Sequence, residues 1–385
     1  MKRISLIAIM ALMGIGSVAA KSSTTLPIVG EVVKATNPLI QYVGRVSFAK
    51  NETASFNFPG TSIFARFQGS SLKMICRPMT GYFMAQVDGC EPFKVGFNAE
   101  RDSVVTVAAA LPKGEHQVKL MYVIEGLFRT PEFRGFVLDK GCSLVKSPDL
   151  PERKIEFIGN SITCGYGVES IEMTDPFEDE TENHWLTYAN IVSDSLNAQH
   201  TSISRSGIGV YRNYDGPKAG SAENMPWQYE YTLFNKHDEK WDFNKYQPQL
   251  VCINLGTNDL STNNYDIALY EKNYRMFLTT VRSKYPNAKI VLITGPMLGE
   301  KESGEQREVL DRICSDANKK GFTLPEEVRK ARKGKNKGDK DIYRFDFTFQ
   351  TGDLGYGASW HPSKLQHQKM ADELLPFLRN LMGWE

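Results

Sequence analysis

The sequence predicts two domains of different class: an all-β sandwich of jelly-roll type over residues 25–146, and an α/β domain with a parallel sheet and flanking helices over residues 153–385. Three observations predict this division. Short alternating segments separated by turn residues fill the first part. Strand segments alternate with amphipathic helical segments in the second part. Pro148 and Pro151 lie between the two parts, where they interrupt any strand ladder.

The expected strands of the first part share an alternation of apolar and polar residues. Turn signals such as Pro59-Gly60 and Asp88-Gly89 separate them. Many short strands that follow one another closely along the sequence, with turns between them, are typical of a β-sandwich. The expected strands are Ala54–Phe58, Ser62–Phe67, Leu72–Ile75, Tyr82–Val87, Ser103–Val107, Gln117–Tyr122 and Phe133–Leu138.

In the second part, apolar segments of strand length alternate along the sequence with segments that have helical periodicity. The expected strands are 154–158, 250–255, 289–294 and 342–346, and the expected helices centre on 188–196, 270–281, 309–314 and 370–381. The clearest helical face is that of Tyr270, Tyr274, Phe277, Leu278 and Val281. Parallel strands that alternate with helices place helices on both faces of the sheet.

Composition and the first residues indicate an exported protein that acts away from nucleic acid and membranes. The 385 residues carry a net charge of +1, which gives no electrostatic footprint for either partner. Residues 1–20 read as a signal peptide, because Lys2 and Arg3 precede a short apolar run and the small-residue site Ser17–Ala20 follows it. The protein is therefore expected to be periplasmic or secreted. The six cysteines show no metal-binding spacing, and we expect neither metal nor cofactor.

Four polar motifs follow expected strands of the second part. They are Gly159-Asn-Ser161, Ser206-Gly207, Gly256-Thr-Asn-Asp259 and Trp360-His-Pro-Ser363. Ligands of open α/β sheets bind at the carboxyl ends of the strands, so these motifs are expected to meet at one edge. A serine hydroxyl becomes an effective nucleophile when a histidine takes its proton. The motifs therefore predict an esterase-like site.

In this order, the four motifs resemble those of the SGNH, or GDSL-type, hydrolase superfamily, over residues 153–385. Asn160 stands where that superfamily usually has aspartate. Residues 40–140 also resemble the β-sandwich of carbohydrate esterase family 2. That likeness is carried by Gly44-Arg45, Phe58-Pro-Gly60, Val87-Asp-Gly89, Gly114-Glu-His116 and Phe133–Asp139.

The resemblance implies a role for each matching residue. Ser161 is the expected nucleophile and His361 the expected general base. The backbone N–H groups of Ser161 and Gly207 and the side-chain amide of Asn258 are the expected oxyanion donors. One such donor contributes about 3–4 kcal/mol to stabilising the transition state.

A third member of the triad is missing from its usual places. The superfamily puts an aspartate three residues before the histidine, and family 2 often puts it two before, but here these positions are Ala358 and Ser359. Asp353 is the first alternative acid and Asp259 the second. The sequence favours a Ser–His dyad, with His361 oriented by a backbone carbonyl or by a carboxylate from elsewhere.

The resemblance also implies removal of O-acetyl groups from plant polysaccharides or oligosaccharides, such as acetylated xylan or glucomannan. Trp360, Tyr166 and Tyr211 are candidates for stacking on sugar rings, and packing in the core is the competing interpretation of each. Two other functions stay open. One is an SGNH esterase for another acetylated or lipid ester, and the other is a non-catalytic carbohydrate-binding protein.

Overall fold

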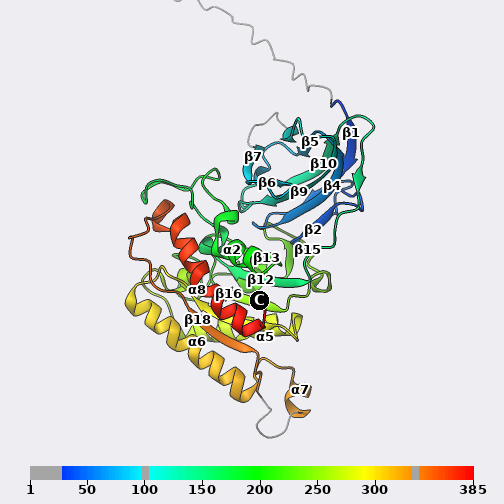
Figure 1. The fold of residues 1–385 in the computed structure, drawn as a ribbon. Helices are drawn as coiled ribbons and strands as arrows, with labels where there is room; N and C mark the ends of the chain where they lie inside the picture. Colours follow the sequence, from blue (N-terminus) through cyan, green and yellow to red (C-terminus); the bar gives the residue numbers. More distant parts are fainter. Residues whose placement is uncertain (1–27, 98–103, 130, 332–337) are drawn as a thin grey trace, which may run out of the picture.

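The computed structural model describes residues 28–97, 104–129, 131–331 and 338–385. The segment interpreted as a signal peptide, residues 1–20, lies outside them. Figure 1 shows an all-β part and an α/β part, side by side.

The first part is a sandwich of two antiparallel sheets. One sheet contains β1 (Glu31–Lys34), β3 (Ala54–Ser55), β5 (Leu72–Cys76), β8 (Val104–Ala108) and β10 (Glu132–Leu138). The other contains β2 (Gln41–Val43), β4 (Ser62–Gly69), β6 (Gly81–Val87), β7 (Phe93–Phe97), β9 (Gly114–Tyr122) and β11 (Leu144–Val145). Phe67 and Phe83 from one sheet and Phe136 from the other share one hydrophobic core, as alternation of inward side chains requires.

One expected strand is shorter than predicted. The segment Ala54–Phe58 was expected to be extended throughout, but β3 ends at Ser55. Phe56 stays in the core of the sandwich, whereas Phe58 leaves it and packs edge to face on Phe234 of the second part, with ring centroids 5.1 Å apart. Both phenylalanines are buried, as the alternating pattern predicts, but they pack in two different hydrophobic cores.

The second part is built on a five-stranded parallel sheet in the order β13-β12-β16-β17-β18. Its strands are β12 (Arg153–Gly159), β13 (Ala198–Ser204), β16 (Leu250–Asn254), β17 (Lys289–Thr294) and β18 (Ile342–Asp346). Helices α2 (Tyr188–Ser195) and α8 (Lys364–Met382) cover one face, and α5 (Ile267–Lys284) and α6 (Glu300–Lys320) cover the other. Phe157 and Ile158 point to opposite faces, as neighbours in a strand do. The predicted fold class is confirmed.

Short elements connect these layers. They are α1 (Ser161–Cys164), α3 (Met225–Gln228), α4 (Thr257–Leu260), α7 (Glu326–Ala331), the hairpin β14 (Tyr231–Leu233) and β15 (Lys236–Lys240), and the 3-10 turns His184–Leu186, Phe243–Lys245 and Ala358–Trp360. Three of them, α1, α4 and the last 3-10 turn, carry residues of the candidate site described below.

A buried arginine fixes the two parts against each other. Arg45 of the sandwich is only 1% exposed and donates to the backbone carbonyl of Tyr231 at 2.8 Å. Its guanidinium also lies 5.0 Å from the ring centroid of Tyr229 and 5.5 Å from that of Trp241. Burying a cation is costly unless it has partners, and here those partners are backbone carbonyls and aromatic rings of the second part, which ties the two parts together.

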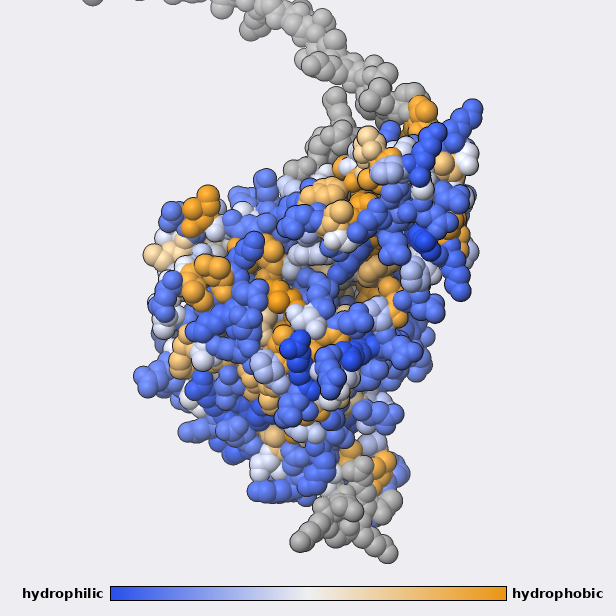
Figure 2. All heavy atoms as spheres, in the orientation of Figure 1, coloured by the Kyte–Doolittle hydropathy of each residue, from blue (hydrophilic) through white to orange (hydrophobic). Residues whose placement is uncertain are grey.

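Hydrophilic residues cover most of the face seen in Figure 2, and the hydrophobic residues on it are scattered among them. Within the described residues, every helix is too short or too polar to cross a bilayer.

Candidate active site

Ser161 lies at the point where β12, the second strand of the parallel sheet, turns into a helix. Strand β12 ends at Gly159, and Ser161 is the first residue of α1. Asn160 caps this helix, because its side chain accepts the backbone N–H of Ile162 at 3.1 Å. A Cβ at position 159 would lie 2.1 Å from the hydroxyl of Thr163, so the turn requires glycine. This local chemistry holds the serine at the carboxyl edge of the sheet.

His361 meets this serine across 200 positions of sequence. Its Nε2 lies 2.8 Å from the Oγ of Ser161. Its Nδ1 lies 3.0 Å from the carbonyl oxygen of Ala358 and 3.2 Å from that of Ser359. A carbonyl oxygen can only accept, so Nδ1 carries the proton and the Nε2 lone pair faces the hydroxyl. The neutral histidine is therefore in the tautomer that can take a proton from Ser161.

The loop that carries His361 is tightly held. Ser359 and Trp360 have φ angles of 51° and 58°, in the left-handed region that costs a residue with a side chain about 1–2 kcal/mol. The N–H of Ala358 donates to the carbonyl of Gly167 at 3.0 Å. A Cβ at position 167 would lie 2.3 Å from that of Ala358, so a glycine after α1 permits the close approach. The hydrogen bond and the close packing at Gly167 offset the cost of the strained turn and hold the imidazole in position.

The ring of Tyr166 covers the imidazole. The centroids of the Tyr166 and His361 rings are 4.1 Å apart and their planes differ by 26°, which is a stacked arrangement. Phe177 packs on the other side of the tyrosine, at 4.6 Å. Burial lowers the pKa of His361 to about 4, although the carbonyls of Ala358 and Ser359 oppose that change. The histidine is therefore a neutral base over a wide pH range.

The expected oxyanion residues emerge from the two strands beside β12. Gly159 is in register with Ser204 of β13 and with Asn254 of β16, so the loops that follow all three strands begin at one edge. Gly207 lies in the first of these loops, with φ of 74°, and Asn258 lies in α4 after the second.

The amide of Asn258 joins the two loops, because its Nδ2 donates to the carbonyl of Ile208 at 2.8 Å. The left-handed backbone at position 207 is unfavourable for any residue with a Cβ, which accounts for the glycine there.

Asp259 orders one of these loops. Its carboxylate accepts three backbone N–H groups, from Val210 at 3.0 Å, Tyr211 at 2.8 Å and Arg212 at 3.0 Å. Burial raises the pKa of this carboxyl to about 6, while the three N–H groups act in the opposite direction. Among the described residues, the hydrogen-bond partners of this carboxylate are backbone groups of the loop, and His361 is not one of them.

The structure does not bring two of the sequence-predicted residues into the site. Asp353 is exposed and accepts a hydrogen bond from the hydroxyl of Thr351 at 2.6 Å, away from His361. Tyr211 is 1% exposed, and its hydroxyl accepts the N–H of Asp266 at 2.8 Å at the start of α5. It is a core residue because the loop held by Asp259 turns its ring inward. Trp360, by contrast, is 52% exposed beside His361.

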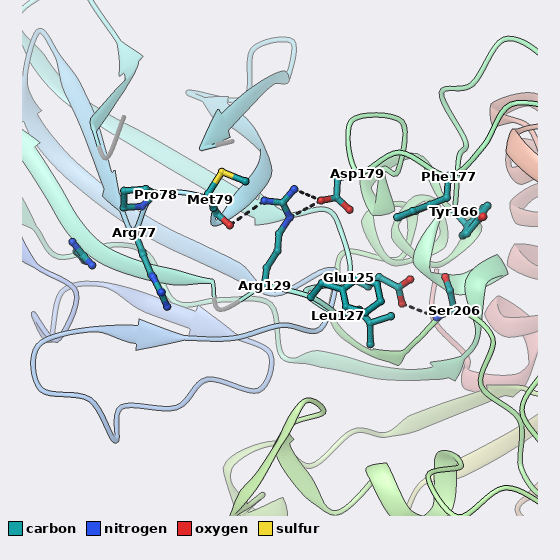
Figure 3. A pocket seen from close by; sticks show the side chains of 12 residues that line it. Arg77, Pro78, Met79, Glu125, Leu127, Arg129, Tyr166, Phe177, Asp179 and Ser206 are labelled. Carbon is teal, nitrogen blue, oxygen red and sulfur yellow. Dashed lines mark hydrogen bonds and ion pairs between the residues drawn. The ribbon is translucent and has the colours of Figure 1, made fainter. Parts of the chain in front are cut away.

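A cavity of about 790 Å³ lies between the two parts of the chain, and its lining includes Tyr166, whose ring stacks on His361. Tyr166, Phe177, Asp179 and Ser206 line it from the α/β part. The sandwich part contributes Arg77, Pro78, Met79, Glu125, Leu127, Phe128, Arg129 and Arg134. Figure 3 shows these two walls facing each other. The sandwich therefore forms one side of the candidate site.

Glu125 is a site residue that the sequence did not reveal. It comes from the loop between β9 and β10, and its carboxylate accepts the N–H of Ser206 at 2.6 Å, one residue before Gly207. Its own N–H donates to the carboxylate of Glu182 at 2.9 Å. Burial raises the pKa of both carboxyls. No motif surrounds Glu125, because its role depends on a contact between domains.

Glu125, Cys164 and Glu182 are also the one group of potential metal ligands found among the described residues, with ligand atoms within 4.8 Å of one another. The cluster is fully buried, and its carboxylates already accept backbone N–H groups. Burial raises the pKa of both carboxyls, and only the spacing of the ligand atoms points to a cation, so we assign no metal to it.

Two family profiles match the chain. Residues 42–148 match the profile described as carbohydrate esterase 2 N-terminal, and residues 155–374 match that of the GDSL-like lipases and acylhydrolases. A solved family two carbohydrate esterase from Clostridium thermocellum, in complex with cellohexaose, is 33% identical over 90% of this chain and 100% of its own, with a TM-score of 0.79. The chain belongs to carbohydrate esterase family 2.

Other relatives agree with this assignment. A solved family two carbohydrate esterase from Cellvibrio japonicus has a TM-score of 0.79 at 25% identity, over 92% of this chain and 98% of its own. An acetylxylan esterase/glucomannan deacetylase of that organism is 27% identical over 91% of each chain. The cellulase/esterase CelE of Acetivibrio thermocellus is 34% identical over 90% of this chain, but the chain spans only 40% of that protein.

The family assignment confirms the resemblance predicted from the four motifs. It also places the chain in the class of carboxylic ester hydrolases acting on carbohydrates. The roles of individual residues are inferred below from the geometry.

Proposed function

We propose that this family 2 carbohydrate esterase removes O-acetyl groups from plant polysaccharides or their oligosaccharides through an acetyl-serine intermediate. One observation carries the mechanism: Nε2 of His361 lies 2.8 Å from Oγ of Ser161, with Nδ1 held by backbone carbonyls. A nucleophile and an oriented base at hydrogen-bond distance are the minimum machinery of acyl transfer. The observation also favours a catalyst over a non-catalytic sugar-binding protein.

The first half-reaction acetylates the enzyme. Ser161 attacks the carbonyl carbon of the acetyl ester while His361 takes the hydroxyl proton on Nε2. The negative charge that develops on the carbonyl oxygen is stabilised by the backbone N–H groups of Ser161 and Gly207 and by the amide of Asn258. The intermediate then collapses, and His361 returns the proton to the departing sugar hydroxyl.

The second half-reaction releases acetate. A water molecule attacks the acetyl-serine carbonyl, His361 takes one of its protons, and that proton returns to the Oγ of Ser161 as the bond breaks. The carbonyls of Ala358 and Ser359 hold the imidazole in place throughout, and they partly stabilise its charged form. We propose that these two oxygens replace the third triad member, so that the enzyme works with a dyad.

The names of the relatives support acetylated xylan or glucomannan as substrates, because two matching proteins of Cellvibrio japonicus are acetylxylan esterases/glucomannan deacetylases. Trp360 and Tyr166 are the aromatic side chains placed to contact the sugars, through the apolar faces of their rings.

The test measures acetate released from acetylxylan, acetylated glucomannan and a long-chain ester. We expect release from the two glycans, little hydrolysis of the long-chain ester, and loss of all activity in Ser161→Ala. Ser283→Ala is a matched control, since Ser283 is an exposed serine of α5. Hydrolysis of the long-chain ester alone would refute the proposed substrate, and an active Ser161→Ala enzyme would refute the mechanism.

We also propose that residues 1–20 are removed on export and that residues 25–146 and 153–385 are the two domains. The mature protein recovered from the producing cell is then expected to begin just after Ala20, which N-terminal sequencing checks. Limited proteolysis of the folded protein is expected to leave the segment 147–152 intact unless the interface held by Arg45 opens.

A further inference from the structure

The sandwich wall of the cavity carries two arginines that the proposed mechanism does not use. Arg77 follows β5 and Arg134 lies in β10, and both line the cavity that Tyr166 also lines. Their side chains are 46% and 41% exposed, so they reach solvent inside a cleft of about 790 Å³. Figure 3 shows Arg77 at the opposite end of the cleft from Tyr166.

The charges on this wall do not balance. Glu132 is 2% exposed and its two carboxylate oxygens are taken by Lys50, at 2.8 and 2.9 Å. The same carboxylate is 3.8 Å from Arg77 and 3.7 Å from Arg134, beyond hydrogen-bond distance. Three cations therefore share one anion. Among the described residues, these three cations and Glu132 carry a net charge of +2, and both arginines belong to the lining of the cleft.

The remaining charged groups of the cleft do not cancel this excess. Arg129 and Asp179 pair with each other across the cavity. The carboxyl of Glu125 is buried, bonded to the N–H of Ser206, and its pKa is raised by burial. The cleft is thus electropositive at the end formed by Arg77 and Arg134, while its other end is lined by Tyr166, whose ring stacks on His361.

We propose that Arg77 and Arg134 bind the carboxylate of a uronic acid in the acetylated polysaccharide, so that the enzyme prefers acetyl groups on acidic glycans. This inference rests on the proposed function and narrows its substrate class. The planar guanidinium presents paired donors that match a carboxylate, and it loses less hydration than an ammonium group on pairing. Apolar side chains of the same wall, Met79 and Leu127, offer a surface for the face of the sugar ring.

The test compares two acetylated xylo-oligosaccharides of equal length and acetyl content, of which only one carries a glucuronic acid branch. The wild type is expected to have the higher kcat/KM on the branched substrate. Arg77→Gln and Arg134→Gln are each expected to lower that value about tenfold, the effect of one hydrogen bond to a charged group. Their effect on the neutral substrate is expected to be smaller, so that the ratio of the two kcat/KM values falls in each variant. About 0.5 M NaCl is expected to reduce the preference, because the arginines are solvent-exposed.

Arg312→Gln is the matched control, since Arg312 is an exposed arginine of α6 with its own acidic partner, Glu271. Binding of the unacetylated branched and neutral oligosaccharides to Ser161→Ala gives a second measurement that needs no turnover. Equal kcat/KM and equal binding for both glycans would overturn this inference and leave the esterase function standing. Acetate release from neither substrate by the wild type would overturn both.

Discussion

The lowered pKa of His361 predicts an unusual pH dependence for the enzyme. The kcat/KM of a serine hydrolase falls on the acid side as its free-enzyme histidine becomes protonated. His361 has a pKa lowered to about 4 from an ordinary value of 6.5, because Tyr166 and the surrounding loop bury its ring. Backbone carbonyls face its Nδ1, where a buried carboxylate would hold the pKa up. We therefore predict an acid limb near pH 4.

The magnitude follows from the two pKa values. At pH 5.5 a histidine with a pKa of 6.5 is about one-tenth neutral, whereas one with a pKa of about 4 is almost wholly neutral. The kcat/KM at pH 5.5 is therefore expected to be within about 5% of its value at pH 8, and not about one-tenth of it. Between pH 4 and 6.5, His361 binds fewer protons in the folded state than in the unfolded state. The contribution of His361 to the free energy of unfolding is therefore fully present above pH 6.5 and is lost as the pH falls through about 4.

The assay measures kcat/KM for 4-nitrophenyl acetate between pH 3.5 and 8, detecting released acetate. Tyr166→Ala uncovers the imidazole and is expected to move the acid limb upward, toward 6.5, whereas Tyr166→Phe keeps the ring and is expected to leave the limb in place. A wild-type limb near 6.5 would refute the reasoning. So would a limb near 6 that Tyr166→Ala does not move, because Asp259 has a carboxyl pKa of about 6 and would then be the group that titrates.

Four further outcomes check the site. Asn258→Ala is expected to lower kcat about 10²–10³-fold with KM nearly unchanged, the usual effect of losing an oxyanion donor, and steady-state kinetics decide it. Asp353→Ala is expected to keep turnover within about twofold, because that carboxylate is exposed; a loss of 10³-fold or more would restore a triad. Tyr211→Ala is expected to lower the free energy of unfolding by about 3 kcal/mol in denaturant titration, because the Tyr211 ring is buried. Trp360→Ala is expected to raise KM for acetylated polymer and to leave stability intact, because the Trp360 ring is exposed. Glu125→Ala releases the N–H that orders the oxyanion loop, so kcat is expected to fall at constant substrate affinity, and unchanged kcat would show that the loop keeps its shape without it.

Much of the fold could be predicted from the sequence where the local pattern and the final environment agree. Two segments were predicted within a few residues: the strand 289–294 and the helix that includes Tyr270 and Phe277. In both, the spacing of the apolar residues matches the period of the element that forms. Strand β13 was missed. Its segment Ala198–Ser204 is rich in polar residues, yet all but one are buried, so its membership of the sheet depends on its neighbours and not on its own hydrophobicity.

The sequence by itself pointed to the residues that we propose for the site. Ser161, Gly207, Asn258 and His361 each follow a sheet strand or precede a helix, and parallel strands deliver such positions to a common edge. Only the tertiary structure decided what surrounds them. The carbonyls at Nδ1 of His361 belong to a left-handed turn, and the residue types in that turn do not predict it. The second wall of the cleft comes from the sandwich part. Hydrogen bonds between distant backbone groups carry no signature in side-chain identity, and for that reason they had to be seen in the folded chain.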